Sequence, residues 1–236
     1  MKAIFLNCTI KPSTETSNTK ALMDKLANRM QELQSDLKIE HIHALDYDIK
    51  YGGGISDMGD GDEWPKLLEK LSNTDILVIG SPVWMGVRSS VTQLVIERLD
   101  GSTKGDEAQF PLYNTVAGLV VTGNEDGAHD VIANTFGNLL HFGCTCPPNT
   151  DVYWVGDAGP GASFIDAGGA LSPYVNRNVE LTAQNLIHGA KMLKNNHYTI
   201  DMRMIKAKMM KGMQIKGKIM MEAVGKMKEA MKSLES

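Results

Sequence analysis

Three loops combine hydroxyl, amide and glycine residues, and each follows an apolar segment directly. The first, NCTIKPSTETSNT at 7–19, precedes a helical pattern. A phosphate there would meet the free backbone N–H groups and the positive dipole end of a helix. The candidate phosphate ligands are Thr9, Lys11, Ser17, Asn18 and Thr19. The alternative is an ordinary Ser/Thr-rich loop with a single N-cap, because the Walker lysine motif is missing.

The second loop, SPVWMG at 81–86, ends a buried β-branched run. It predicts a Ser-Pro turn at the carboxyl end of a strand, where open α/β sheets bind their ligands. A flat redox cofactor needs backbone polar groups at one edge and an apolar surface on one face, which Trp84 or Met85 would supply. The candidate residues are Pro82, Val83, Trp84, Met85 and Gly86. Alternatively, Trp84 only fills the end of the sheet.

The third loop, TGNEDG at 122–127, again lies between a strand and a helix. Its glycines permit close approach of the backbone, and Asn124 both donates and accepts hydrogen bonds. The candidate residues are Thr122, Gly123, Asn124, Asp126 and Gly127. His129 would face either the cofactor or solvent. A longer segment at 156–169 contains five glycines and is either a substrate-side or subunit-contact loop or plainly disordered.

The elements that must position these loops follow from hydrophobic patterning. Continuous apolar runs predict buried parallel strands at 3–7, 75–80, 116–122 and 151–155, and looser alternation predicts an edge strand at 38–45. Helical periodicity at 22–33, 91–99, 131–140 and 179–193 fills the gaps, with Asn18 as the first N-cap and a short helix starting at Trp64. The α/β alternation predicts a doubly wound, five-stranded parallel sheet in the order 2-1-3-4-5. The missing G-x-G-x-x-G argues against a Rossmann dinucleotide fold.

Together the loops resemble those of the NADPH-dependent FMN reductase family, within the flavodoxin-like fold. The resemblance is carried by residues 81–86, 121–129 and 154–161 and by the pattern from Asn7 to Thr19. It covers residues 1–196. The chain departs from the family at 8–12, where Cys-Thr-Ile-Lys-Pro replaces a commoner Gly-Ser-Pro-Arg type of sequence.

The resemblance implies noncovalent FMN, with its phosphate on residues 9–19 and its ring between 82–86 and 122–127. It also implies NAD(P)H as the co-substrate that gives hydride to flavin N5, and a quinone or similar small molecule as electron acceptor. We expect no catalytic side chain, because the cofactor carries the chemistry. Arg88 would meet a nucleotide phosphate or form a surface salt bridge.

Charge divides the chain into an acidic body and a basic tail. Residues 201–236 carry nine Lys/Arg and four Asp/Glu, a net charge of +5, whereas the remaining residues carry −9. An acidic body argues against nucleic acid as the main partner. No apolar run is long enough to span a membrane and no signal peptide is recognisable, so we expect a cytoplasmic protein. We also expect a homo-oligomer, most simply a dimer.

Two sequence patterns resemble metal-binding motifs but lack the ligands that such motifs require. Cys144 and Cys146 have no further ligands at useful spacing, and small buried hydrophobes are the better interpretation. The acid-rich segment at 57–63 fails the spacing of a calcium loop and lacks its distal glutamate. We therefore expect no metal site.

We expect an FMN-binding domain at 1–198 and a basic, Met-rich helical tail at 199–236. An apolar stripe runs through Met202, Ile205, Met209, Met213, Met220, Val224, Met227, Met231 and Leu234. A helix of this length would span roughly 50 Å, more than the width of its own domain, about 40 Å. It would therefore break at Gly212, Gly217 or Gly225, pack on another protein or subunit, or contact a membrane surface. Disorder is a further alternative.

Three functions compete. The first is an FMN-dependent NAD(P)H oxidoreductase. The second is a flavodoxin-like electron-transfer protein without nicotinamide turnover. The third is an interaction protein that has lost its cofactor and acts through its tail.

Overall fold

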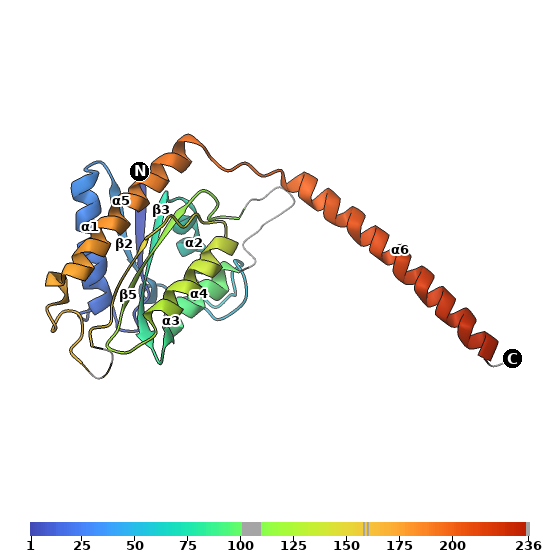
Figure 1. Ribbon diagram of the computed structural model, residues 1–236, viewed down its shortest axis with the longest axis horizontal. Coiled ribbons are helices and arrows are strands. Elements are labelled where there is room, and N and C mark those ends of the chain that lie inside the picture. The colour runs from blue at the N-terminus through green and yellow to red at the C-terminus, as the bar shows by residue number, and fades with distance from the viewer. Residues whose placement is uncertain (101–109, 158, 160, 235–236) are drawn as a thin grey trace. The chain divides into compact units, whose positions relative to one another are not determined.

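A single parallel sheet organises the chain, and the carboxyl ends of its strands carry the three loops (Figure 1). The computed structural model describes residues 1–100, 110–157, 159 and 161–234, and the side chains of these up to 227. The strands are β1 (Lys2–Asn7), β2 (Lys38–His43), β3 (Ile76–Trp84), β4 (Val87–Arg88), β5 (Val116–Thr122) and β6 (Asp151–Trp154). The helices are α1 (Asn18–Leu33), α2 (Trp64–Ser72), α3 (Ser90–Leu99), α4 (Ala128–His141), α5 (Pro173–Asn195) and α6 (Met202–Leu234). Short 3-10 helices lie at Ala44–Asp46 and Gly169–Leu171.

The parallel strands run in the order β2-β1-β3-β5-β6, and β4 pairs only with the end of β3. Without that hairpin strand, this is the predicted flavodoxin-like order 2-1-3-4-5, which is confirmed. All five parallel strands are continuous apolar runs except β2, whose alternating pattern fits its edge position.

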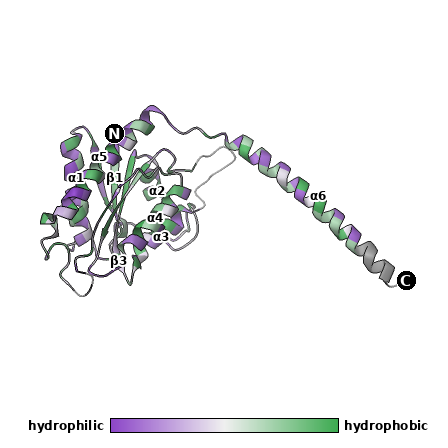
Figure 2. Cartoon of the chain, in the orientation of Figure 1, coloured by the Kyte–Doolittle hydropathy of each residue, from purple (hydrophilic) through white to green (hydrophobic). Residues whose placement is uncertain are grey.

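Helices cover both faces of the sheet, which explains why its central strands β1, β3 and β5 are buried on two sides (Figure 1). One apolar cluster joins the sheet to α2, α3 and α4, and includes Trp64, Val95 and Leu139. The other joins it to α1 and α5, and includes Leu26 and Leu186. Figure 2 shows the same division, with hydrophobic strands between amphipathic helices.

The predicted turn at Ser81-Pro82 is wrong. Both residues continue β3, opposite Val121 and Thr122 of β5. The chain reverses two residues later, at Met85 and Gly86, which have φ values of 47° and 79°. Gly86 adopts this left-handed region without steric cost, so the turn forms there and β4 returns antiparallel to β3. The Ser-Pro pair thus extends β3 along β5, past Gly80, where its pairing with β1 ends.

A fully buried ion pair anchors the long segment between β2 and α2. Arg98 donates from Nη2 to Asp62 Oδ2 at 2.8 Å, and both side chains have no exposed surface. The guanidinium also donates to the carbonyls of Lys50, Gly54 and Ser56. Burial alone raises the pKa of Asp62, but the hydrogen bonds from Arg98 and from three backbone N–H groups outweigh it and hold that pKa well below the usual range. The pair therefore stabilises the fold above pH ~4 and progressively less as pH falls below the unfolded-state value.

The structure separates residues 199 onward from the rest as a second unit. Its helix α6 is continuous and does not break at Gly212, Gly217 or Gly225. Met209, Met213, Met220, Val224 and Met227 of the predicted stripe are exposed, while Met231 and Leu234 lie outside the side chains described. Green and purple alternate along this helix in Figure 2. Among the described residues, no helix is both long and apolar enough to cross a membrane.

Replacing Arg98 with methionine is expected to lower the free energy of unfolding by about 3–5 kcal/mol, because it leaves the Asp62 carboxylate buried without its partner. Lys66→Met is the matched control, since Lys66 forms an exposed pair with Glu63 and its loss should cost less than about 1 kcal/mol. Urea titrations at neutral pH would measure both. Equal effects of the two substitutions would contradict the role given to the buried pair.

Candidate functional site

Most of the loop residues singled out in the sequence surround one cleft at the carboxyl ends of β1, β3 and β5. The cleft has a volume of about 270 Å³. The predicted residues that line it are Thr9, Lys11, Asn18, Thr19, Pro82, Val83, Trp84, Thr122, Gly123 and Asn124. Ile10, Glu125, Ser163 and Phe164 also line it. Ser17, Met85, Gly86, Asp126 and Gly127 do not, and support the cleft in ways described below.

The first turn of α1 forms the polar end of the cleft. Ser17, and not Asn18, is the N-cap: its hydroxyl accepts the Lys20 N–H at 3.1 Å. Asn18 instead begins the helix, and its side chain accepts the N–H of Ile165. The reason is local, because Ser17 has the extended backbone that an N-cap needs. The first N–H groups of α1 therefore face the cleft end with no acceptor inside the helix.

Side chains around this helix end are held by specific contacts. The Thr19 and Thr122 hydroxyls share a buried hydrogen bond of 2.7 Å, which joins α1 to the end of β5. Lys11 donates from Nζ to the Thr16 carbonyl at 3.1 Å, so its ammonium lies across the loop. One cation, several hydroxyls and a helix N-terminus make this end suited to a phosphate.

The hairpin of β3 and β4 forms the apolar end of the cleft. Trp84 is half exposed and Met85 is 87% exposed. The Met85 N–H donates to the Glu125 carboxylate at 2.8 Å, which joins the hairpin tip to the loop after β5. An exposed indole beside backbone N–H and C=O groups suits a flat, partly polar ring.

Two glycines allow the hairpin to approach the loop after β5. A Cβ on Gly127 would lie 2.5 Å from the Cα and carbonyl oxygen of Gly86, and its φ of 121° disfavours other residues. A Cβ on Gly123 would lie 3.0 Å from the Val83 side chain. Asp126 accepts the N–H of Gly127 and shapes the start of α4. Gly86, Asp126 and Gly127 thus set the width of the cleft without lining it.

Buried hydroxyls connect the polar and apolar ends. Ser89 caps α3, and its hydroxyl donates to the Cys8 carbonyl at 2.6 Å. The Ser81 hydroxyl accepts from the Ser89 N–H and from the Thr92 hydroxyl. This network links the loop after β1 to the hairpin. Beneath it, burial raises the pKa of the Cys8 thiol to about 12, so Cys8 is a structural residue and not a nucleophile.

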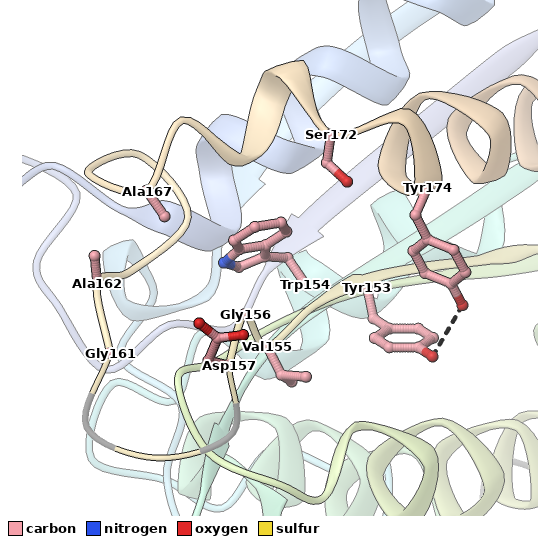
Figure 3. Close-up of a pocket in the computed structure, with 10 residues that line it drawn as sticks. All are labelled: Tyr153, Trp154, Val155, Gly156, Asp157, Gly161, Ala162, Ala167, Ser172 and Tyr174. Carbon is pink, nitrogen blue, oxygen red and sulfur yellow. Dashed lines mark hydrogen bonds between the residues drawn. The ribbon is translucent and has the colours of Figure 1, made fainter.

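The glycine-rich loop after β6 borders two cavities. Ser163 and Phe164 close one side of the cleft, and Asn124 donates to the Gly161 carbonyl. A second cavity, of about 620 Å³, is lined by Tyr153, Trp154 and Tyr174 (Figure 3). There, the hydroxyls of Tyr174 and Tyr153 share a 2.9 Å hydrogen bond; this bond, followed by burial, raises the pKa of Tyr153 to about 12. Pro160 lies outside the described residues.

Other candidates have structural partners. Arg88 donates to the side chains of Gln93 and Asn138, so its guanidinium joins α3 and α4. His129 packs edge-on against Tyr153 at 5.2 Å between ring centroids. Burial raises the pKa values of Cys144 and Cys146, and no group of three metal-binding side chains occurs among the described residues.

Comparison with known proteins agrees with this geometry. The family model of NADPH-dependent FMN reductase matches residues 1–158. The 8-demethyl-8-aminoriboflavin-5'-phosphate synthase of Streptomyces davaonensis is 37% identical over 212 residues, which cover 86% of this chain and 82% of that protein. The chain belongs to the NADPH-dependent FMN reductase family. It is thus a member of a family of flavoproteins.

Solved structures extend the comparison. The crystal structure of RosB with bound 8-demethyl-8-formylriboflavin-5'-phosphate is 35% identical, with a TM-score of 0.80 over 90% of this chain and 87% of that one. The apo form of the NADH:FMN oxidoreductase EMOB has a TM-score of 0.57 over 81% of this chain and 89% of that one. At 14% identity, EMOB supports the flavodoxin-like fold alone.

Gly127→Ala is expected to weaken FMN binding at least about tenfold and to lower the melting temperature, because the new methyl group meets the backbone of the hairpin tip. Gly137→Ala, within α4, the helix that Gly127 caps, is the control. It has open space around its Cβ position and should stabilise α4 by up to about 1 kcal/mol. Fluorescence titration with FMN and thermal melting measure both effects. Unchanged FMN affinity in Gly127→Ala would contradict the proposed width constraint.

Proposed function

We propose that this FMN reductase family member is an FMN-dependent oxidoreductase that takes hydride from NAD(P)H onto flavin N5 and passes electrons to a quinone or similar small acceptor. One observation carries the proposal: a phosphate-type site and an exposed aromatic surface share a single cleft at the β1/β3 switch point. The residues present therefore fit FMN at both of its ends.

The polar end would bind and orient the phosphate. Backbone N–H groups at the start of α1, the hydroxyls of Thr9 and Thr19 and the Lys11 ammonium supply donors and charge. The Asn18 side chain is already committed to Ile165, so its backbone N–H is the more available donor. The backbone N–H groups that the loop presents would then contribute most of the affinity for the phosphate.

The apolar end would hold the ring and leave one of its faces open. Pro82, Val83 and Trp84 come from the extended end of β3, and Gly123 and Asn124 come from the loop opposite. Preorganised backbone donors near the ring would favour the negative charge that develops on reduction. The exposed hairpin tip would leave space for nicotinamide and, after it departs, for the acceptor. We also propose that the protein is a homo-oligomer.

An anaerobic absorbance experiment tests the lead function. Protein incubated with FMN and desalted is expected to keep the flavin bands, and NADPH or NADH should bleach them within seconds. A quinone added afterwards should restore them. Retained bands that neither nucleotide bleaches would indicate an electron-transfer protein. Loss of the bands on desalting would contradict the cofactor assignment and support an interaction protein.

A second candidate is an enzyme that binds the flavin as its substrate and modifies the ring. It is favoured by the similarity to the aminoriboflavin phosphate synthase and to RosB, which covers most of both chains. Both functions would use the phosphate end of the cleft. The flavin ring would be recovered unchanged in the oxidoreductase and chemically altered in the ring-modifying enzyme.

Mass spectrometry of the bound flavin separates the two candidates. After turnover with NAD(P)H and a quinone, the lead function predicts FMN of unchanged mass, recovered in full. After aerobic incubation with FMN and a mixture of amino acids as amine donors, a ring-modifying enzyme would release a flavin of altered mass. Boiled protein controls for non-enzymatic change.

A further inference from the structure

We propose that His43 is a positioning residue for the FMN phosphate. It lies outside the cleft, on the neighbouring strand β2, and acts through Asn7 and the backbone of Lys11. This inference rests on the proposed phosphate end of the cleft. His43 and Asn7 are not the phosphate's own donors; they fix the shape of the loop that presents those donors.

The His43 ring joins β2 to the loop after β1. Its Nε2 lies 2.9 Å from the Lys11 carbonyl oxygen. Because a carbonyl can only accept, Nε2 must carry the proton. In the neutral ring Nδ1 is then an acceptor, and it faces the Asn7 side-chain Nδ2 at 3.4 Å. The tautomer thus follows from the partners.

Asn7 completes the connection. It is only 5% exposed and lies opposite His43 in the parallel pairing of β1 and β2. Its Oδ1 accepts the Thr9 N–H at 3.2 Å, so its amide group must turn Nδ2 toward His43. The hydrogen bonds from His43 to Lys11, from Asn7 to His43 and from Thr9 to Asn7 are therefore all compatible with one tautomer of His43 and one orientation of the Asn7 amide.

Both ends of this chain of bonds reach residues that line the cleft. Thr9 and Lys11 both line the cleft, on the loop that follows β1. His43 therefore fixes the backbone from which the Lys11 ammonium extends toward the Thr16 carbonyl. Without the ring, the Lys11 carbonyl loses its partner and the loop gains freedom, which costs phosphate affinity more than ring affinity.

His41 provides an internal comparison on the same strand. It borders the same 210 Å³ cavity behind the loop as His43. Its ring instead lies 3.6 Å from the Asp24 carboxylate and packs on Phe5. Among the described residues, His41 forms no hydrogen bond or ion pair with residues 7–19, so replacing it should leave phosphate recognition unchanged.

The test compares FMN with riboflavin, which lacks the phosphate. Dissociation constants for both flavins are measured by fluorescence quenching in the full chain and in His43→Leu, His43→Asn, His43→Gln and His41→Leu. The preference for FMN over riboflavin should fall about tenfold in His43→Leu and His43→Asn, since neither reaches the Lys11 carbonyl. His43→Gln should retain most of the preference, because its terminal amide can donate where Nε2 does. His41→Leu should match the unmodified chain.

Riboflavin affinity serves as the control for folding in each variant, and the paired His43→Asn covers the case in which His43→Leu does not fold. A full preference for FMN in both His43→Leu and His43→Asn would overturn the inference. Equal loss in His43→Gln and His43→Leu would also overturn it, because the donor would then be irrelevant. If the unmodified chain itself binds both flavins equally, the failure lies in the proposed phosphate site and not in His43.

Discussion

The close approach of α1 to β3 is the constraint on which the cleft depends. Gly80 makes it possible, because a Cβ there would lie 2.2 Å from Met23 Sδ and 2.9 Å from Thr19 Cγ2. With the helix seated on the sheet at this point, Thr19 reaches Thr122 at the end of β5. The parallel register, Asn7 opposite Gly80 and Pro82 opposite Thr122, then brings all three loops to one edge. The polar start of α1 and the exposed side chain of Trp84 therefore border the same cleft.

Hydrogen bonds between loops convert this proximity into a defined shape. Ser89 joins the loop after β1 to the start of α3, Glu125 joins the hairpin tip to the loop after β5, and Asn18 joins α1 to the loop after β6. Each bond links segments far apart in sequence. A binding site built in this way is largely preorganised, which reduces the ordering cost when a ligand binds.

The sequence predicts the sheet order and most of the cleft because both depend on local signals. Buried parallel strands are continuous apolar runs, and loop residues such as Thr9 and Asn124 follow them directly. The glycines at 156–169 suggest a substrate-side loop, but they do not single out Ser163 and Phe164, because only the tertiary path of that loop brings these two residues to the cleft. The β3–β4 hairpin also depends on a tertiary contact. The sequence Ser81-Pro82 favours a turn, but pairing with β5 extends β3 through these residues, and the chain reverses at Gly86 instead. The sequence does not indicate the positioning role proposed for His43, because that role depends on the pairing of His43 with Asn7 between β2 and β1.

Hydrogen–deuterium exchange with and without FMN tests the central claim, that one cleft at the ends of β1, β3 and β5 binds the flavin. The account predicts slower exchange on adding FMN at the start of α1, at the β3–β4 hairpin and at residues 123–127. The amides beside Tyr153 and Tyr174, which line the larger cavity, should change little. Protection confined to that larger cavity, with the start of α1 unaffected, would contradict the account.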